Sequence, residues 1–176
     1  MPETRLPEGG VGIAASHPGD VGIDEHASVV FVEDFAVEAV GELEQRWDSV
    51  GGPDIMSLSD DTPTGEGQSL LVTHVGGQGT GGQLYRRLLP GHDRVFARTY
   101  VKFDPDCAKI HHFGTHLGGF DPPTPWPQGG AGTRPDGAKR FTTGVEPYGD
   151  EWAWDFYTYW QGMHVHGDGN YWGTPF

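Results

Sequence analysis

Cysteine is nearly absent from this chain of 176 residues, which contains only Cys107. A single cysteine excludes an intrachain disulfide, so the fold depends on its packing. No apolar run reaches the about 18 residues that a membrane-spanning helix needs, so no membrane partner is expected. The opening residues MPETRLPEGG lack the charged and then apolar segments of a signal peptide, and none is expected in this chain.

Cations are also scarce, since 11 Lys and Arg stand against 25 Asp and Glu, a formal charge of -14. Residues 1–84 carry 15 acidic and 2 basic side chains, whereas residues 85–140 carry 9 of the basic ones. The overall field repels phosphate, so no nucleic acid is expected as a partner. A local cationic groove for an anionic ligand remains open, and solubility is the simpler explanation of the N-terminal acids.

Regular helical patterning is limited, whereas 29 glycines and 14 prolines divide the chain into short segments. This pattern predicts an all-β fold, an antiparallel β-sandwich or jelly roll. One short helix is expected over residues 36–47, because Val37, Val40, Leu43 and Trp47 recur at spacings of three and four. The expected strands cover residues 29–32, 55–58, 69–74, 82–88, 94–103, 110–113, 141–146 and 152–160. Residues 114–136 are expected to be an irregular loop. Residues 1–27 are expected to form an extended arm, and residues 28–176 a sandwich domain that lacks its C-terminal strands.

Two of the expected strands alternate between apolar and polar side chains. Side chains on a strand point to opposite faces in turn. In residues 94–103 the polar face holds Arg98, Tyr100 and Lys102, and in residues 152–161 it holds Tyr157, Tyr159 and Gln161. The tryptophans of the second strand fall on its other face, where we expect them to back the core. Guanidinium groups and flat rings suit an anionic sugar chain, although an ordinary solvent face has the same pattern.

Histidines form a second group of candidate functional residues. His112 and His116 precede or enter the long loop, which also contains Trp126 and Arg134. Near the C-terminus, His164, His166 and Asp168 have a spacing that a metal pair would use. No H-E-x-x-H motif or cysteine pair supports a metal, and surface histidines are the simpler interpretation. A neutral histidine also serves as a proton acceptor without a metal.

Four segments together resemble the concanavalin A-like jelly-roll polysaccharide lyases, in particular the alginate and glucuronan lyase families numbered 14 and 20. These segments are VVFVEDF, RVFARTYVKFDPD, KIHHFGTHLGGF and WDFYTYW. The resemblance implies β-elimination on a polysaccharide that contains uronic acid, with no required cofactor and room for a structural divalent cation. It also implies an extracellular or periplasmic location.

The resemblance further implies roles for single residues. Arg98 would neutralise the substrate carboxylate, and Tyr157 and Tyr159 would serve as base and acid, with His112 as the alternative base. The expected substrate-binding residues are Tyr100, Lys102, His116, Trp126, Arg134 and Gln161.

The chain also departs from the pattern of those lyases. His111 and His112 stand where the lyases tend to carry a lysine, and residues 121–128 form a proline-rich insert without a counterpart. The chain stops where a jelly roll would still need return strands, which suggests a fragment. Two other functions therefore remain open. One is a non-catalytic carbohydrate-binding sandwich that uses Trp126, Tyr157 and Tyr159 as stacking platforms, and the other is a histidine-based metal-binding protein.

Overall fold

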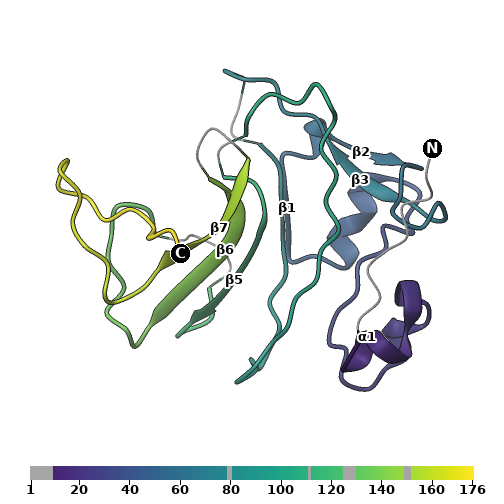
Figure 1. Cartoon of the computed structure of the whole chain (residues 1–176), viewed down its shortest axis with the longest axis horizontal. Helices are drawn as coiled ribbons and strands as arrows, with labels where there is room; N and C mark the ends of the chain where they lie inside the picture. Colours follow the sequence, from purple (N-terminus) through teal and green to yellow (C-terminus); the bar gives the residue numbers. More distant parts are fainter. Residues whose placement is uncertain (1–9, 79–80, 111, 125–129, 149–151) are drawn as a thin grey trace. The chain divides into compact units, whose positions relative to one another are not determined.

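A computed structural model describes residues 10–78, 81–110, 112–124, 130–148 and 152–176. The chain divides into two compact units, Met1–Leu88 and Leu89–Phe176 (Figure 1). In the described part, the helices are at most six residues long, whereas the longest strands have seven and nine residues. The chain is therefore β-rich with a few short helices, as the sequence predicts.

The first unit contains short helices and two small antiparallel sheets. α1 (Ile13–Ser16), η1 (Pro18–Asp20) and η2 (Ile23–Glu25) lie within the segment that was expected to be extended, and none of their residues is buried. β1 (Ser49–Gly51) pairs with β4 (Gln83–Tyr85), and β2 (Met56–Ser59) pairs with β3 (Ser69–Val72). The turn η4 (Pro53–Ile55) connects β1 to β2. Three predicted strands are thus confirmed: β2 is shifted by one residue from 55–58, and β3 and β4 are shorter than expected.

The predicted helix over residues 36–47 is reduced to the 3-10 helix η3 (Val40–Gln45). Ala39 has an extended backbone, with φ -148° and ψ 151°, so the helix begins only after it. Leu43, in the apolar positions that suggested the helix, is completely buried. The apolar spacing therefore identified the residue that packs inside but overestimated the length of the helix.

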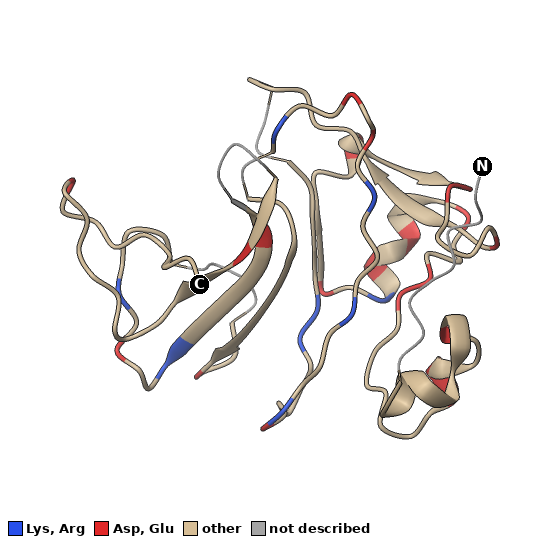
Figure 2. Cartoon of the chain, in the orientation of Figure 1, with Lys and Arg blue, Asp and Glu red and all other residues tan. Residues whose placement is uncertain are grey.

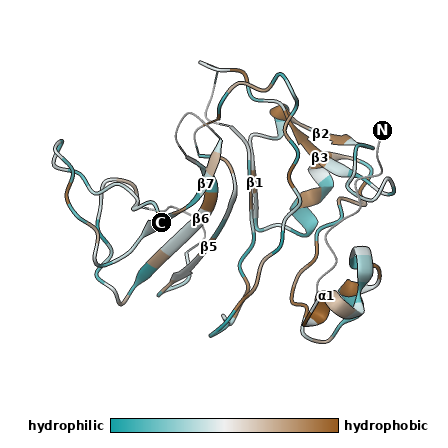
Figure 3. Ribbon diagram, in the orientation of Figure 1, coloured by the Kyte–Doolittle hydropathy of each residue, from teal (hydrophilic) through white to brown (hydrophobic). Residues whose placement is uncertain are grey.

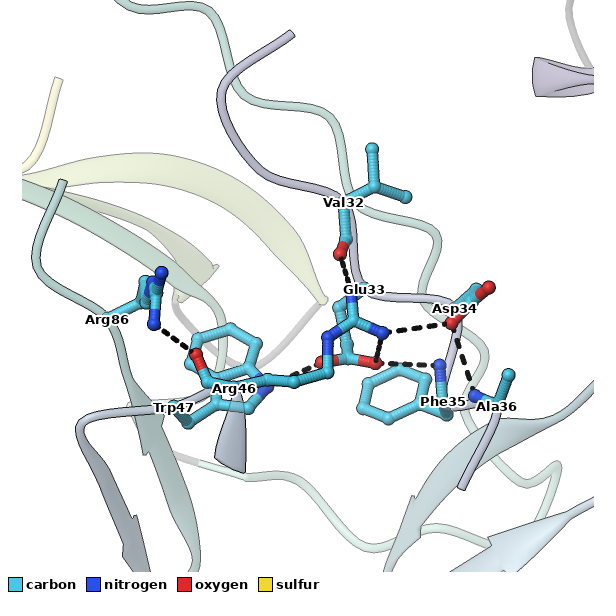
Figure 4. A network of polar contacts seen from close by, with 8 residues as sticks. All are labelled: Val32, Glu33, Asp34, Phe35, Ala36, Arg46, Trp47 and Arg86. Atoms are coloured by element: carbon cyan, nitrogen blue, oxygen red, sulfur yellow. Dashed lines mark hydrogen bonds and ion pairs between the residues drawn. The ribbon is translucent and has the colours of Figure 1, made fainter. Parts of the chain in front are cut away.

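The predicted strand over residues 29–32 is wrong, because polar side chains fix this segment in place of a strand ladder (Figure 4). Arg46 donates to the Val32 carbonyl and forms a 3.4 Å ion pair with Glu33. The Trp47 Nε1 group donates to the same Glu33 carboxylate at 2.7 Å. Since the Glu33 side chain is only 7% exposed, these contacts compensate a charge that is largely removed from water.

The second unit is built on one antiparallel sheet with the order β5 (Thr115–Phe120), β6 (Arg140–Tyr148) and β7 (Ala153–Tyr159). The C-terminal residues extend the free edge of β7. Thr158 and Thr174 exchange backbone hydrogen bonds of 3.0 and 2.8 Å, and the Phe156 N–H donates to the Phe176 carbonyl. β6 is the central strand of the three, and β7 is also bordered on both sides.

Two strand predictions and one loop prediction in this unit need correction. Residues 94–103 and the described residues of 110–113 belong to no strand, whereas β5 lies inside the loop that was expected to be irregular. β5 pairs with β6 along its whole length, so a partner ladder compensates for its three weak strand formers, His and two Gly. The predicted strands 141–146 and 152–160 are confirmed as β6 and β7.

The two faces of this sheet differ from the expectation. Trp154, Phe156 and Trp160 remain 47, 54 and 37% exposed, so the tryptophan face does not back a core. Figure 3 shows brown, hydrophobic bands between paler stretches along β6 of the same sheet. On the opposite face Tyr159 is only 6% exposed. The physical reason is that the C-terminal segment packs against the tyrosine face, with Gly173 directly on the ring of Tyr157. The alternation was predicted correctly, but the buried side was not.

Acidic residues are prominent in the first unit, over its helices and loops (Figure 2).

No helix of the described residues is long and apolar enough to cross a membrane.

The Glu33 contacts generate a stability prediction. Glu33→Gln removes the charge that Arg46 and Trp47 compensate, and we expect it to lower the free energy of unfolding by about 2 kcal/mol. Urea unfolding followed by tryptophan fluorescence measures this. Asp34→Asn is the matched control, because Asp34 contacts the same arginine but is 63% exposed, and its loss should stay below about 1 kcal/mol. Equal losses in the two variants would contradict the importance of burial here.

Candidate functional site

The polar face of the β5–β6–β7 sheet collects side chains that carry chemistry. The strand register places His116, Gly144 and Tyr157 in one row across the three strands. The next row toward one end of the strands contains Tyr159 opposite Thr142. The next row toward the other end contains Asp155 opposite Glu146. Because alternate residues share a face, all of these side chains belong to the same side of the sheet.

Glu146 is the centre of this polar face. Its side chain is 3% exposed, and its carboxylate oxygens lie 2.9 and 3.2 Å from Nδ1 of His112. A second imidazole approaches from β5, with Nε2 of His116 at 3.6 Å from Oε2 of Glu146. A buried carboxylate is expensive unless it is paired and hydrogen-bonded, and here two histidines supply the partners.

The two histidines have opposite shifts of their pKa. The hydrogen bond to Glu146 raises the pKa of His112 above its ordinary value. Desolvation lowers the pKa of His116, and the nearby Glu146 charge opposes this only in part. Environments that push two titratable groups apart are typical of acid and base pairs. In an intermediate pH range, His112 is therefore the more protonated imidazole of the two.

Two glycines make room for the rings of this face. A Cβ atom at Gly144 would lie 2.3 to 2.7 Å from the ring atoms of His116. A Cβ atom at Gly173 would lie 2.4 Å from the ring of Tyr157. Any larger residue at Gly144 or Gly173 would collide with these rings. The two glycines are therefore required for the observed positions of the His116 and Tyr157 rings.

The two tyrosines of β7 differ in their surroundings. The Tyr157 ring is 5.1 Å from the ring of His112, and its hydroxyl is 3.5 Å from the hydroxyl of Tyr159. Burial strongly raises the pKa of Tyr159, and the hydrogen bond between the Tyr157 and Tyr159 hydroxyls adds to this. Tyr159 therefore remains protonated and is a poor base. Tyr157, half-buried and beside His112, is better placed to contact a ligand.

Asp155 is the unusual group of the site. Both oxygens of its carboxyl group are buried, and neither has a hydrogen-bond partner in another described residue. Desolvation raises its pKa, and the neighbouring charge of Glu146 raises it further. Two carboxylates that face each other in a desolvated place do not both ionise easily, so Asp155 holds its proton more tightly than an ordinary aspartate.

Of the predicted catalytic residues, the structure brings together His112, Tyr157 and Tyr159, with His116 beside them. Arg98 lies on another segment, with its guanidinium 5.7 Å from the ring centroid of Tyr100. Lys102 lies on that same exposed segment.

The segment that carries Arg98 contacts the beginning of β5. Thr115 donates a 2.8 Å hydrogen bond to Thr99, and the rings of Phe103 and Phe113 are 5.2 Å apart. Residues 99 and 103 thus contact residues 115 and 113 in opposite chain order, which is the order of antiparallel neighbours.

The remaining predicted binding residues have separate positions. The guanidinium of Arg134 lies 5.4 Å from the ring of Tyr171. Gln161 lines a shallow cavity together with Gly137, Arg140, Phe141 and Trp160. Trp126 lies outside the described residues.

The metal hypothesis finds little geometry in its favour. Asp168 accepts hydrogen bonds from the Asn170 backbone and side chain and from Trp172 Nε1, so its carboxylate organises a turn. Among the residues that the structure describes, no group of three or more His, Cys, Asp or Glu side chains has the arrangement of a metal site. His164 and His166 lie in the same exposed C-terminal segment.

Sequence reasoning missed both Glu146 and Asp155 as site residues, although Asp155 alternates onto the same face as Tyr157 and Tyr159. A signal for Glu146 was present, because it follows Gly144 by two positions in a β-branched strand and so shares the face of His116 and Tyr157. Its burial depends on His112, 34 residues away, and no local pattern reveals such a partner.

Comparisons with known proteins give no relative, since no family model, no curated protein and no solved structure matches the chain.

The raised pKa of Asp155 generates a pH-dependent stability prediction. The folded chain binds this proton more tightly than the unfolded chain, so the group stabilises the fold below its ordinary pKa of 3.8. That contribution is lost as the pH rises through the raised pKa. We therefore expect Asp155→Asn to gain stability relative to the wild type with rising pH, by on the order of 1 kcal/mol at neutral pH.

Urea unfolding at a series of pH values measures this difference. Asp168→Asn is the control with the opposite sign, because hydrogen bonds from Asn170 and Trp172 lower the pKa of Asp168. Its carboxylate stabilises the fold above the ordinary pKa, and this contribution is lost as the pH falls. Parallel pH profiles for wild type and Asp155→Asn would show that the Asp155 proton is not linked to folding.

Proposed function

We propose that the chain is a polysaccharide lyase-like protein that acts on a uronic acid-containing polysaccharide by β-elimination. The observation that carries this proposal is the buried Glu146 carboxylate, which holds His112 beside Tyr157 on one polar sheet face. A proton acceptor and a phenolic donor are thereby adjacent, and this is the pair of groups that an elimination requires.

The proposed reaction removes a proton from C5 of the uronate and delivers another proton to the glycosidic oxygen on C4. Neutral His112 takes the C5 proton of the uronate, and the electron pair left behind forms the C4–C5 double bond. The C4–oxygen bond then breaks, and Tyr157 gives its phenolic proton to the leaving glycosidic oxygen. Tyr159, which stays protonated, lies 3.5 Å from the Tyr157 hydroxyl and stabilises the phenolate that results.

The C5 proton becomes acidic only if the charge of the substrate carboxylate is neutralised. We assign this role to Arg98, assisted by Lys102. Support comes from the contacts of residues 99 and 103 with residues 115 and 113, which have the antiparallel order. We propose that the alignment at Thr99 and Thr115 continues by one residue and brings Arg98 beside His116. The remaining binding contacts of the proposal are Tyr100, His116, Trp126, Arg134 and Gln161.

We further propose that the sheet is one layer of a concanavalin A-like sandwich or jelly roll. Support comes from the contrast between its faces, one lined by His116, Glu146 and Tyr157 and the other by Trp154 and Phe156. In a sandwich the apolar face packs against a second sheet, and Trp154 and Phe156, which are 47 and 54% exposed, are the side chains that such a sheet would cover.

A carbohydrate-binding function without turnover is the second candidate. It is favoured by the exposure of Trp154 and Trp160, 47 and 37% respectively, because flat exposed aromatic rings pack well on sugar faces. Retention of polyuronates without any unsaturated product would favour this candidate over the lyase.

The test is an assay of the purified chain with polymannuronate, polyguluronate and polyglucuronate, followed by the ultraviolet absorbance of the unsaturated product. We expect at least one substrate to be cleaved. His112→Asn and Tyr157→Phe should each lower kcat by on the order of 10²-fold or more, because each removes a proton-transfer group. Tyr85→Phe, in β4 of the first unit, is the matched control and should leave turnover unchanged.

Two results would count against the proposal. If no polyuronate yields unsaturated product, the lyase function is wrong. If Tyr157→Phe retains full activity in a protein that His112→Asn inactivates, the assignment of the acid is wrong.

A further inference from the structure

Glu146 contacts the proposed base, His112, through an almost completely buried side chain. It lies on the central strand β6, is 3% exposed, and receives His112 Nδ1 at 2.9 Å and 3.2 Å on its two oxygens. An imidazole has two nitrogens, and a carboxylate at one of them determines which nitrogen carries the proton in the neutral ring. Contact with both oxygens also fixes the plane of the ring.

The backbone of His112 supports a specific placement of this ring. Its φ is 58°, in the left-handed region that non-glycine residues rarely adopt. Such conformations are retained where surrounding contacts overdetermine them, and they occur frequently at functional sites. The Glu146 hydrogen bond is a contact of this kind, because it joins residues that are 34 positions apart.

The groups that face His112 and Glu146 come from each neighbouring strand. They are His116 on β5, with Nε2 3.6 Å from Glu146, Asp155 opposite Glu146 on β7, and Tyr157, whose ring is 5.1 Å from that of His112. His112 and His116 are thus the ion-pair partners that the structure shows for the buried carboxylate. Removal of its charge would change the protonation of these imidazoles first.

We propose that Glu146 is a positioning residue, whose carboxylate accepts the Nδ1 proton of His112 and thereby presents Nε2 as the nitrogen that takes the substrate proton. This role rests on the proposed elimination. It assigns no contact between Glu146 and the sugar. In the step itself, the C5–H bond breaks, Nε2 forms a new N–H bond, and Glu146 stabilises the imidazolium through the Nδ1–H hydrogen bond.

The direction of the pKa shift agrees with this role. The hydrogen bond to Glu146 raises the pKa of His112, which makes the neutral ring a stronger base. The same interaction shifts the acidic limb of the activity profile to higher pH, since His112 must be neutral to accept a proton. Loss of the Glu146 charge should therefore lower the pKa of His112 and move that limb to lower pH.

The experiment is a nuclear magnetic resonance titration of the full chain with ¹⁵N-labelled histidine rings, in which His112→Asn identifies the His112 signals. In the wild type we expect neutral His112 to carry its proton on Nδ1 and to titrate above its ordinary pKa of 6.5. Glu146→Gln keeps a hydrogen-bond acceptor but removes the charge, so the His112 pKa should fall. Asp168→Asn, an exposed carboxylate in the same unit, should leave the His112 titration unchanged.

A wild-type His112 that carries its neutral proton on Nε2 would overturn the inference, whatever the activity. A His112 pKa that does not change in Glu146→Gln would also overturn it. These readouts come from the wild type and from a nearly isosteric variant, so they do not depend on a variant that fails to fold.

Activity measurements separate this inference from the proposed function. If the chain cleaves a polyuronate, Glu146→Gln should lower kcat by on the order of 10-fold or more with little change in KM, and should move the acidic limb to lower pH. An unchanged pH profile in an active variant would overturn the positioning role. If the wild type yields no product but His112 is protonated on Nδ1, the proposed function fails and the Glu146–His112 pairing stands.

Discussion

The burial of one carboxylate on the central strand of the second unit is the constraint on which the site depends. Glu146 is almost inaccessible, and an uncompensated charge in such a position would cost several kcal/mol. Two imidazoles compensate it. On β7, desolvation raises the pKa of the facing Asp155, and the charge of Glu146 raises it further. The protonation of His112, His116 and Asp155 is consequently determined together, and no member of the group titrates as an isolated side chain.

The shape of the same face depends on two glycines, which leave space for neighbouring rings. Gly144 lets the ring of His116 lie over the central strand, and Gly173 lets the C-terminal segment pack on the ring of Tyr157. The second contact helps to explain why the tyrosine side of β7 is the more buried one. It also leaves Tyr159 inside and protonated, while Tyr157 remains half-buried at the edge of the packed region. Gly144 and Gly173 therefore determine both how this face packs and where its titratable rings lie.

Part of this site could be predicted from the sequence. The features that could not be predicted all depend on contacts between residues that are distant in the sequence. Alternation along residues 152–160 correctly grouped Tyr157 with Tyr159, because the period of a strand is local. It could not show which face would be buried, because that depends on the C-terminal segment. Likewise residues 29–32 have strand propensity, but side-chain contacts such as that of Arg46 with the Val32 carbonyl hold them in a non-strand conformation. β5 has little strand propensity but pairs with β6 along its whole length. Glu146 was missed for the same reason, since its partner is distant in the sequence.

The uneven charge of the chain bears on how an anionic polysaccharide would approach such a site. Residues 1–88 contain 15 acidic and 4 basic side chains, whereas residues 89–176 contain 10 acidic and 7 basic ones. The repulsive field thus originates mainly in the unit that lacks the candidate site. Exposed charges act over about 8 Å at physiological ionic strength, so salt screens this long-range repulsion strongly. Contacts between a bound carboxylate and a guanidinium are shorter than that distance and are screened less. Moderate salt would therefore favour association with an anionic chain through the weaker repulsion, while the short-range pairs that orient the substrate persist.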